Sequence, residues 1–536
     1  MTGNIDLFGK RRSALGFWVG CAAVTAGVLA HVPMFLMGRE MHYRLAGMPM
    51  DDAMLWGMAA IVGGLALAAY GLLPKRVAPA SYRIESIAPP EDAPLTARHW
   101  GVAGLLALAL VVDIMKPASL GFVTPGMRDE YDLDQMTVSW LPFAALAGTA
   151  VGSFIWGALA DIYGRRAAIL LSSVMFVGTS ICGAMPSFGW NVAMCLLMGA
   201  AAGGMLPVAY ALLAEIMPTR HRGWMLVLIG GIGATGGFLA ASGFSAILQP
   251  VFGWRIMWCL NLPTGLLLIG LSPLLPESAR FLQQMGRAAE ARAMLAQFGV
   301  VARQDGAARP ASLRTAQAVA RTSHTPLGGA PTSSLLGITV ALTLTAVAWS
   351  LINFGILLWL PGALIAEGRS VAGASALIAR STLVGAPLIL LCASLYRTWS
   401  TKGSLLAMVA LAACGLAGLG LGSARLGLLG AAAVAATLLI VGSSGIISIL
   451  LPYTAENYPL RVRGRATGWI AGCSKLGGLL AQGLSVAGIE PRLAAASLVI
   501  GVTTLGALAL IVRYGRETRL RDLRDLERAA LPEEAS

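Results

Sequence analysis

The sequence predicts an all-α, polytopic membrane protein, and two observations carry this prediction. Of its 536 residues, 57% are hydrophobic and only 12% are charged, about half the charged share of an average soluble domain. Apolar runs of roughly 20 residues, each long enough to cross a ~30 Å hydrocarbon core as a helix, recur along nearly the whole chain. Helices are the expected spanning elements because backbone polar groups in lipid must be satisfied within the segment.

Fourteen spans are expected, as two helices followed by twelve. Their approximate ranges are 14–37, 53–73, 100–122, 139–160, 166–186, 190–214, 225–248, 256–275, 334–361, 372–395, 404–422, 427–451, 466–487 and 493–513. Two breaks interrupt them, one rich in proline and one that ends rich in Ser, Thr, Pro and Gly. We therefore divide the chain into an extra two-helix segment (1–76), a cytoplasmic linker (77–99), a six-helix bundle (100–276), a cytoplasmic central loop (277–333), a second six-helix bundle (334–513) and a cytoplasmic tail (514–536).

The connections between spans alternate in charge, which predicts the orientation of the chain. Lys and Arg gather on one set of connections, for example at 10–12, 165–166 and 461–465. The opposite set is acidic, with clusters at 51–52 and 129–134. Because basic loops stay in the cytoplasm, both termini are expected there. The bias toward Ala, Leu, Gly and Arg favours a bacterial inner membrane.

The first span allows two interpretations. Lys10, Arg11 and Arg12, followed by an apolar run and Leu29-Ala30, also fit a cleavable signal peptide. The run is long for a signal peptide, so an uncleaved helix is preferred. The rest of the topology is the same in either case.

Composition disfavours several other classes of protein. The net charge of +13 does not indicate a nucleic-acid partner, because the Arg residues lie in short loops without interleaved aromatics, where the positive-inside rule explains them. The seven cysteines lie in apolar segments without a CxxC pair, so no metal and no cofactor is expected. An enzyme is disfavoured because the sequence contains no Ser/His/Asp or His/Cys constellation.

The two halves repeat one phrase at the end of their fourth helices. Glu215-Ile-Met-Pro-Thr-Arg-His-Arg222-Gly matches Glu456-Asn-Tyr-Pro-Leu-Arg-Val-Arg463-Gly, with Glu, Pro, both Arg and Gly in register. This offset of 241 residues relates the halves, as internally duplicated membrane folds require. Glu215 with Arg222, and Glu456 with Arg463, would form charge networks that hold one conformation. Anchoring at the lipid interface is the alternative.

A second motif carries a family resemblance. Gly157-Ala-Leu-Ala-Asp161-Ile-Tyr-Gly164-Arg165-Arg166 resembles the loop between helices two and three of the major facilitator superfamily. The repeated phrase, Gly253-Trp-Arg, Pro276-Glu-Ser-Ala-Arg and Gly515-Arg-Glu-Thr are similar to phrases of its sugar-porter, aromatic-acid:proton symporter and synaptic-vesicle-like branches. The resemblance covers residues 100 to about 527. It implies two six-helix bundles with pseudo-twofold symmetry around a central cavity, with alternating access by rocking, and the two extra helices lie outside it.

The motif loop has a physical logic of its own. Its glycines let helices approach closely, Asp161 can cap or pair at a helix end, and Arg165 and Arg166 supply partners for it. The resemblance implies that Asp161 belongs to a salt-bridge lock that stabilises the outward-facing state. By the offset of 241, its second-half counterpart is Lys402, so the lock is expected to be one-sided. The alternative is that Arg165 and Arg166 only set the topology.

Four charged residues stand inside predicted spans. They are Asp113 and Lys116 in the first body helix, Arg380 in the eighth and Lys475 in the eleventh. Since a charge costs at least ~2.5 kcal/mol at the centre of a membrane helix, each is expected to have a partner or a function. Asp113 and Lys116 lie three residues apart, so they share a helix face and could simply pair with each other.

Other features favour a role for these charges in the transport path. Pro117, Gly121 and Pro125 predict an irregular first helix that lines a cavity. The resemblance places helices one, four, seven and ten along the path, which makes Asp113 a candidate proton site. Arg380 and Lys475 could bind an anionic group of the substrate, or lie at the periphery with their charges in the interface.

One departure from the family bears on proton coupling. Relatives carry an Arg in the fourth helix ahead of Gly-x-x-x-Gly-Gly, whereas this chain has Cys195 ahead of Gly199 and Gly203-Gly204. Lys116 could replace that Arg as the cation beside Asp113. Otherwise the protein would be a uniporter.

The leading interpretation is proton-coupled import of a small organic anion or polar metabolite by alternating access. The protein is expected to act as a monomer in the lipid bilayer, with a small-molecule substrate and protons as partners. Two alternatives remain: export of a drug or metabolite, and a transporter-like sensor or scaffold without flux. The degenerate positions Lys402 and Cys195 lend some weight to the second of these.

Overall fold

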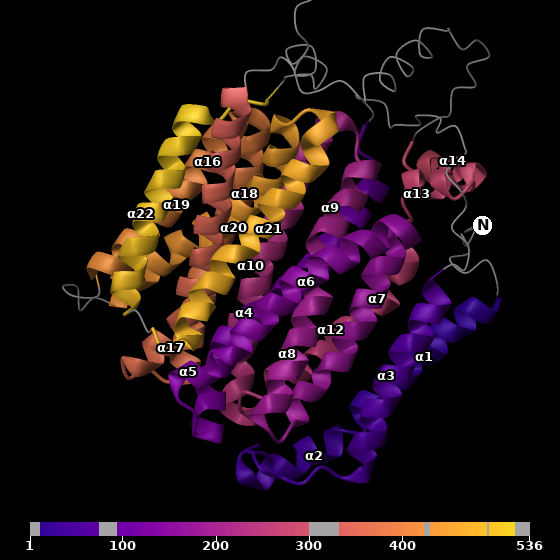
Figure 1. The fold of residues 1–536 in the computed structure, drawn as a ribbon, viewed down its shortest axis with the longest axis vertical. Coiled ribbons are helices and arrows are strands. Elements are labelled where there is room, and N and C mark those ends of the chain that lie inside the picture. Colours follow the sequence, from indigo (N-terminus) through magenta and orange to yellow (C-terminus); the bar gives the residue numbers. More distant parts are fainter. Residues whose placement is uncertain (1–10, 74–93, 300–331, 423–428, 490–491, 520–536) are drawn as a thin grey trace, which may run out of the picture.

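The computed structural model describes residues 11–73, 94–299, 332–422, 429–489 and 492–519. In this part of the chain, 13 helices are long and apolar enough to cross a membrane. One further helix, α21 (Leu460–Val486), runs among them (Figure 1) and completes the fourteen predicted spans. Its hydropathy is lower because it carries three arginines and Lys475. Most of the predicted linker at 77–99, of the central loop at 277–333 and of the tail at 514–536 lies outside the described residues.

The first half is built from six spans. They are α4 (Ala97–Tyr131), α6 (Trp140–Tyr163), α7 (Arg165–Gly178), α8 (Phe188–Ala202) with α9 (Met205–Ile216), α10 (Thr219–Phe252) and α12 (Asn261–Gly270). Short α5 (Gln135–Val138) and α11 (Ile256–Cys259) precede α6 and α12, and α13 (Ala279–Gln284) and α14 (Ala288–Ala296) follow.

The second half repeats this layout. It contains α16 (Thr332–Leu351) with α17 (Leu357–Ala366), α18 (Val371–Thr398), α19 (Thr401–Gly422), α20 (Leu429–Asn457), α21 and α22 (Leu493–Tyr514). In Figure 1 the purple-to-magenta first half and the orange-to-yellow second half stand side by side. They meet along α10, which packs against α18 and α20.

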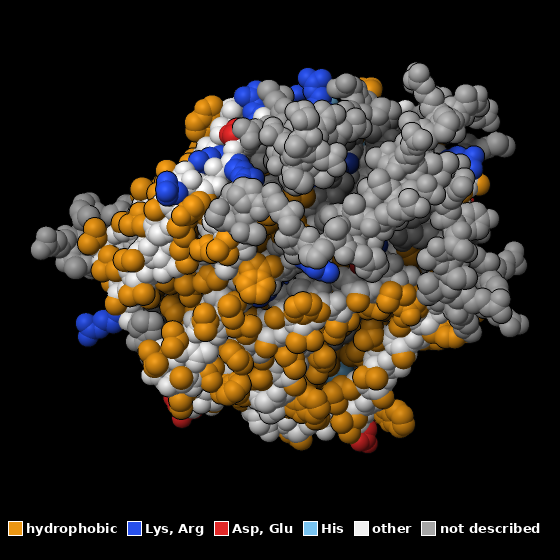
Figure 2. Space-filling model, turned by 45° about the horizontal axis from the view of Figure 1, so that its top comes forward, with side chains coloured by type: hydrophobic (Ala, Val, Ile, Leu, Met, Phe, Trp, Pro, Cys, Tyr) orange, Lys and Arg blue, Asp and Glu red, His pale blue; other side chains and the backbone are white. Residues whose placement is uncertain are grey.

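The two ends of the helix bundle differ in charge. Figure 2 shows hydrophobic side chains over the broad lateral surface, Lys and Arg gathered toward one end and acidic side chains at the other. We call the end that holds Arg165, Arg222 and Arg463 the basic end, and the end that holds Asp51 and Glu130 the acidic end. An apolar belt between two polar rims matches a bilayer, and the charge difference follows the predicted alternation of the loops.

The two extra helices form a tight hairpin on the outside of the first half. In it, α1 (Arg11–Leu29) packs along α3 (Asp52–Leu72), and a Cβ at Gly20 would lie only 2.5 Å from the main-chain nitrogen of Ala68. The hairpin covers α7, where Gly178 faces Ile61 and Val24, on the side away from the second half (Figure 1). That the first helix is uncleaved stays a prediction.

A buried carboxylate ties the hairpin to the acidic end of the first half. Glu130, at the end of α4, pairs with Arg255 at 2.7 Å, and both side chains are almost inaccessible to solvent, at 4% and 0% exposure. Its carboxylate also accepts the main-chain N–H groups of Leu45 (2.7 Å) and Ala46 (3.0 Å) from the α1–α3 connection, and the indole N–H of Trp254 (2.8 Å). These bonds fix the connection to the ends of two body helices.

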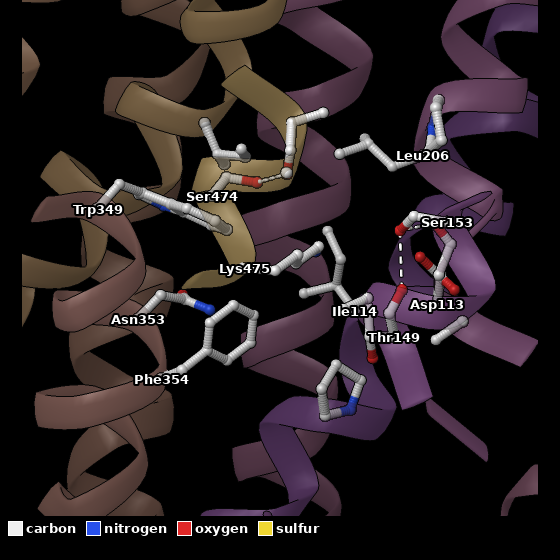
Figure 3. Close-up of a pocket in the computed structure, with 18 of the residues that line it drawn as sticks. Asp113, Ile114, Thr149, Ser153, Leu206, Trp349, Asn353, Phe354, Ser474 and Lys475 are labelled. Atoms are coloured by element: carbon white, nitrogen blue, oxygen red, sulfur yellow. Dashed lines mark hydrogen bonds between the residues drawn. The ribbon is translucent and has the colours of Figure 1, made fainter. Parts of the chain in front are cut away.

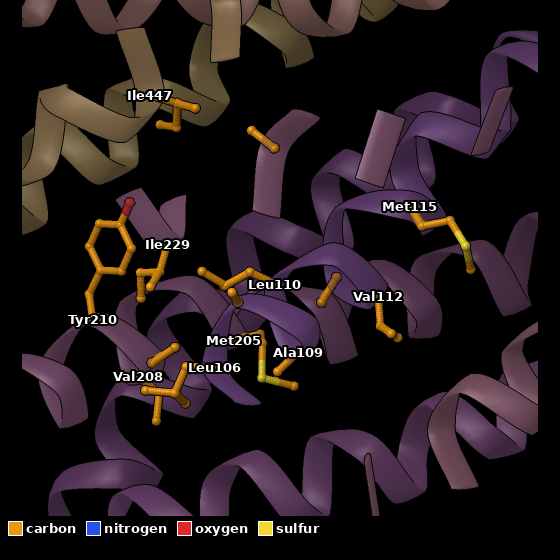
Figure 4. Packing of buried hydrophobic residues seen from close by; sticks show 14 of the residues in the cluster. Leu106, Ala109, Leu110, Val112, Met115, Met205, Val208, Tyr210, Ile229 and Ile447 are labelled. Carbon is orange, nitrogen blue, oxygen red and sulfur yellow. The ribbon is translucent and has the colours of Figure 1, made fainter. Parts of the chain in front are cut away.

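An apolar core supports the helix that carries Asp113. Leu106 and Leu110 of α4, four residues apart and therefore on one face, are buried in one cluster with Met205 and Val208 of α9 and Ile229 of α10 (Figure 4). This contact of three helices gives the residues that follow on α4 a rigid position.

Candidate functional site

A cavity of about 380 Å³ lies between the two halves. Its wall is mainly apolar, and both halves contribute polar side chains. These are Asp113 of α4, Thr149 and Ser153 of α6, Asn353, Ser444 of α20, and Ser474 and Lys475 of α21. Figure 3 shows the first-half group facing the second-half group across the cavity, with Trp349 and Phe354 beside Asn353. A cavity of this size, apolar with a few polar groups, is typical of sites for small organic ligands.

Asp113 occupies an irregular turn of α4. Pro117, one turn later, lacks an N–H group, so the main-chain carbonyl of Asp113 loses its helical hydrogen bond. The Asp113 side chain is only 6% exposed, and its Oδ1 has no hydrogen-bond partner among the described residues. Both residues line the cavity, as the sequence predicted for this stretch of helix.

Lys475 projects from the opposite wall. Its Nζ lies 5.6 Å from the centroid of the Phe354 ring. Phe354 and Asn353 belong to the π-helical turn Ile352–Ile356 between α16 and α17, a widened turn of the kind that often marks functional sites. The side-chain amide of Gln482 donates to the main-chain carbonyl of Phe354 at 2.5 Å, which holds α21 against this turn.

The structure brings only two of the four predicted intramembrane charges to the cavity. Lys116 is buried inside the first half, with its Nζ 3.0 Å from the centroid of the Phe176 ring of α7 and no hydrogen-bond partner among the described residues. It forms no ion pair with Asp113 within 4.0 Å in that part of the chain. Arg380 is exposed on α18 and does not line the cavity. The rotation of each helix in the bundle decides this, because it determines in which direction each side chain points.

The motif loop forms a charge cluster at the basic end. Arg165 is the first residue of α7. Its Nη2 atom lies 3.1 Å from a carboxylate oxygen of Asp161 and 3.4 Å from a carboxylate oxygen of Glu215. Its neighbour Arg166 points inward and donates to the carbonyl of Ser272 at 2.8 Å. The predicted lock residues are thus gathered around Arg165.

Glu277 completes this cluster, although sequence reasoning assigned no role to it. Its Oε1 accepts the main-chain N–H groups of Arg165 (2.9 Å) and Arg166 (3.3 Å), so it caps the start of α7. Gly164 makes room for it, because the φ of Gly164 is +103° and a Cβ there would lie 2.5 Å from Glu277 Oε2. Gly157, by contrast, has nothing within 4 Å of an added Cβ, so it mediates no close approach.

The second half repeats the capping arrangement, with hydroxyl groups around its carboxylates. Glu517, beyond α22, accepts the main-chain N–H of Thr401 at 3.0 Å and its hydroxyl at 2.6 Å, which caps α19. Glu456 accepts hydroxyl hydrogen bonds from Tyr396 (2.7 Å) and Thr518 (2.6 Å). The signal in the sequence is an acid followed by Ser or Thr just after the last helix of each half, Glu277-Ser278 and Glu517-Thr518.

The two capping carboxylates lie outside the membrane-spanning segments, and their pKa values differ. Burial raises the pKa of Glu277, although three main-chain N–H groups act against it. Burial also acts to raise the pKa of Glu517, but hydrogen bonds from two hydroxyls and two main-chain N–H groups outweigh it and hold this pKa at about 2.

The residues at which α7 and α19 begin correct one predicted correspondence between the halves. Because α7 begins at Arg165 and α19 at Thr401, the offset there is 236 residues (165 to 401), not 241. The counterpart of Asp161 is therefore Arg397 (161 to 397), and not Lys402. A single offset fails because the second half has five more residues between this helix start and the repeated Glu (401 to 456, against 165 to 215).

Among the described residues, neither Arg397 nor Lys402 forms a second-half counterpart of the salt-bridge cluster around Arg165. The guanidinium carbon of Arg397 lies 5.0 Å from the centroid of the Trp224 ring of α10, so it contacts the other half. Lys402 donates to the carbonyl of Val512 at 2.9 Å within its own half.

In each of the two predicted Glu–Arg pairs, the two charges interact. Arg222 interacts with Glu215 through space, but the ion pair of Glu215 among the described residues is with Arg165. The charge of Arg463 interacts with that of Glu456, and the Nε–H of Arg463 donates a hydrogen bond to the carbonyl of Tyr458 at 3.2 Å.

The halves touch each other between the cavity and the acidic end. A Cβ at Gly121 of α4 would lie 2.6 Å from the carbonyl oxygen of Leu358 of α17. On the neighbouring pair of helices, Gly483 of α21 lies next to Phe143 of α6, with 3.6 Å between an added Cβ and the ring. These contacts join the two halves on the acidic side of the cavity.

Comparisons with known proteins agree with this architecture. Residues 105–482 match the model of the family described as "Major Facilitator Superfamily". The niacin transporter NiaP of Acinetobacter baylyi is 24% identical over 396 residues, which cover 73% of this chain and 87% of that protein. A gallate transporter of Pseudomonas putida is 28% identical over 454 residues, which cover 80% and 95% of the two chains.

A solved structure shares the fold. The xylose transporter XylE from E. coli, in a partially occluded inward-open conformation, matches with a TM-score of 0.62 at 14% identity, covering 80% of this chain and all of that one. Two repeated helical halves, a cavity between them and a family match over most of the chain lead to one conclusion. The chain belongs to the Major Facilitator Superfamily and is a multi-pass membrane transporter.

Proposed function

We propose that this transporter imports a small aromatic or heteroaromatic monocarboxylate together with protons across a bacterial inner membrane. The observation that carries the proposal is the cavity, which places an acid on one half opposite a cation and two aromatic rings on the other. Its relatives named for niacin and gallate support the substrate class, since both compounds are single-ring acids.

The second-half wall supplies what such a substrate needs. Lys475 provides an ammonium group for the carboxylate, as charge-assisted hydrogen bonds to carboxylates are short and strong. The rings of Trp349 and Phe354 offer faces and edges for an aromatic ring, and Asn353 and Ser474 offer hydrogen bonds for ring substituents.

Asp113 is proposed as the proton site. It is the acid of the cavity wall, it lacks a hydrogen bond at Oδ1, and the carbonyl freed by Pro117 lies in the same turn. Lys116 and Arg380 take no direct part in this proposal because neither reaches the cavity.

Alternating access is proposed to use the two ends of the bundle. With the basic end in the cytoplasm, as the loop charges predict, the contact of Gly121 with Leu358 is proposed to close the outer side of the cavity in an inward-facing state. Asp161, Arg165 and Glu215 are already paired with one another within the first half, and they are proposed to form the first-half side of the contact that closes the basic end in the opposite state.

The proposal is tested by uptake into liposomes that contain the purified protein. Labelled nicotinate, gallate and benzoate are compared with xylose, with and without an inward proton gradient. We expect uptake of at least one acid, stimulated by the gradient, and no gradient-driven uptake in Asp113→Asn. Uptake of xylose alone would contradict the substrate class, and acid uptake that ignores the gradient in both proteins would make the protein a uniporter.

A further inference from the structure

The two halves meet along two seams, which differ in how closely their helices approach. The seam of α10 with α18 is closed at both ends. Near the basic end, a Cβ at Gly223 of α10 would lie 3.3 Å from the ring of Tyr396 of α18. Near the acidic end, the hydroxyl groups of Ser245 and Ser375 are hydrogen-bonded at 2.7 Å.

The second seam is formed by α6 and α21, which run side by side at the boundary between the halves (Figure 1). Toward the acidic end, a Cβ at Gly483 of α21 would lie 3.6 Å from the ring of Phe143 of α6. Closer to the basic end, added Cβ atoms at Gly157 of α6 and at Gly468 and Gly472 of α21 would meet no described atom within 4 Å. The two helices therefore diverge toward the basic end.

The cavity reaches the lateral surface where these helices begin to diverge. Phe154 of α6 and Leu476 of α21 both line the cavity, yet they are 75% and 48% exposed. Because the helices are antiparallel, an equal count from the contact of Phe143 with Gly483 pairs Phe154 with Gly472 (143 to 154, 483 to 472). We call the gap between Phe154 and the stretch 472–476 the lateral slot. It opens near the middle of α6, at a depth where acyl chains are the surrounding solvent.

A basic side chain stands above the slot on the same face of α21. From Arg465 to Leu476 the chain makes three helical turns, so both side chains share one face and lie about 16 Å apart along the axis. This is roughly half the thickness of a hydrocarbon core, which places Arg465 at the rim where headgroups lie. Arg465 is exposed and forms no ion pair within 4.0 Å in the described part of the chain. Trp469, 58% exposed, follows one turn later, and indole rings favour this interfacial depth.

We infer that the lateral slot binds one phospholipid of the leaflet at the basic end. The phosphate accepts hydrogen bonds from the guanidinium of Arg465, since charge-assisted bonds between Arg and phosphate are strong. One acyl chain follows α21 past Trp469 into the slot, and its end lies between Phe154 and Leu476 at the edge of the cavity.

The surroundings of the slot fit this ligand. Its rims are apolar, so they match an acyl chain and offer no hydrogen bonds to a water-soluble solute. The same antiparallel count places Asp161 opposite Arg465 (143 to 161, 483 to 465), and Arg165 balances the charge of Asp161 at 3.1 Å. The phosphate therefore meets a cation without a neighbouring uncompensated acid. Because α6 and α21 must approach each other to close the basic end, a chain in the slot favours the state in which this end is open.

The experiment maps where an acyl chain touches the full-length protein in phosphatidylcholine liposomes. A trace of phosphatidylglycerol carries a photoreactive diazirine at the end of one chain, and labelled residues are identified by peptide mass spectrometry. We expect labelling around Phe154 and Leu476 to exceed that at Val62 and Val502 by at least about fivefold, the typical effect of one basic residue on a lipid headgroup. Val62 of α3 and Val502 of α22 are 70% and 72% exposed near the middle of their helices. Equal labelling at all four places would mean ordinary surrounding lipid only and would overturn the inference.

Two variants and a second probe test the parts of the site. Gly472→Trp places a side chain in open space inside the slot and should lower slot labelling at least about fivefold, whereas Leu484→Trp, on the lateral surface of the same helix, should not. Arg465→Gln should also lower it about fivefold, and Arg292→Gln, an exposed arginine of α14, should leave it unchanged. A diacylglycerol with the same photoreactive chain lacks the phosphate and should label the slot about fivefold less. Slot labelling that survives Gly472→Trp, or that is equal for the two probes, would contradict the site.

Discussion

A single methyl group at Gly121 should shift the balance between the two conformations. In the structure, a Cβ on Gly121 would lie 2.6 Å from the carbonyl oxygen of Leu358 and 3.3 Å from its Cα, whereas ordinary contact begins near 3.4 Å. The backbones of α4 and α17 would have to separate by roughly 0.8 Å, and overpacking of this kind costs about 1–3 kcal/mol. The cost falls only on the state in which the acidic end is closed, so it changes the ratio of states about 5–150-fold toward the other one.

The assay for Gly121→Ala is the accessibility of the cavity from the acidic side. Ser153, which lines the cavity, is replaced by cysteine in a background without the seven native cysteines, and labelling by a membrane-impermeant thiol reagent is timed. We expect labelling from the acidic side to rise at least about fivefold. Gly104→Ala is the matched control on the same helix, because a Cβ there has nothing within 4 Å. Equal labelling in Gly121→Ala and Gly104→Ala would refute the reasoning that this contact closes the cavity.

Three further predictions concern the parts that hold this machinery together. Glu130→Gln removes one partner of a buried ion pair and should lower the free energy of unfolding by about 3–5 kcal/mol, seen as a lower Tm in detergent. Asp132→Asn, an exposed neighbour, should leave Tm unchanged. Gly164→Ala forces a side chain into a φ of +103° and against the carboxylate that caps α7, so it should reduce both Tm and transport by more than Gly157→Ala, which meets open space. The folded-state pKa of Glu517 is about 2, below its usual 4.5, so its contribution to stability is present above pH 4.5 and is lost as pH falls toward 2. The difference in Tm between the wild type and Glu517→Gln should therefore shrink over this pH range, and a constant difference would argue against the cap.

The membrane architecture could be predicted from the sequence because it depends on local composition. Each span needs only enough consecutive apolar residues to cross the bilayer, and the loops need only their charges to set orientation. The repeated phrase around Glu215 and Glu456 likewise revealed the duplication without any contact being known. Asp113 was a candidate for the same reason, since a carboxylate in an apolar span next to Pro117 conflicts with its surroundings.

Which charges face the cavity was decided only by the tertiary structure. Asp113, Lys116, Arg380 and Lys475 look alike in the sequence, as single charges in apolar helices, yet only Asp113 and Lys475 line the cavity. Helix rotation and packing set this, because they determine whether a side chain meets a neighbouring ring, lipid or the space between the halves. The role of Glu277 also required the fold, since the helix that it caps begins 112 residues earlier in the chain. The sequence by itself determined that this chain spans a membrane as a duplicated helical transporter. The assignment of an acid and a cation to opposite walls of one cavity came from how the helices pack.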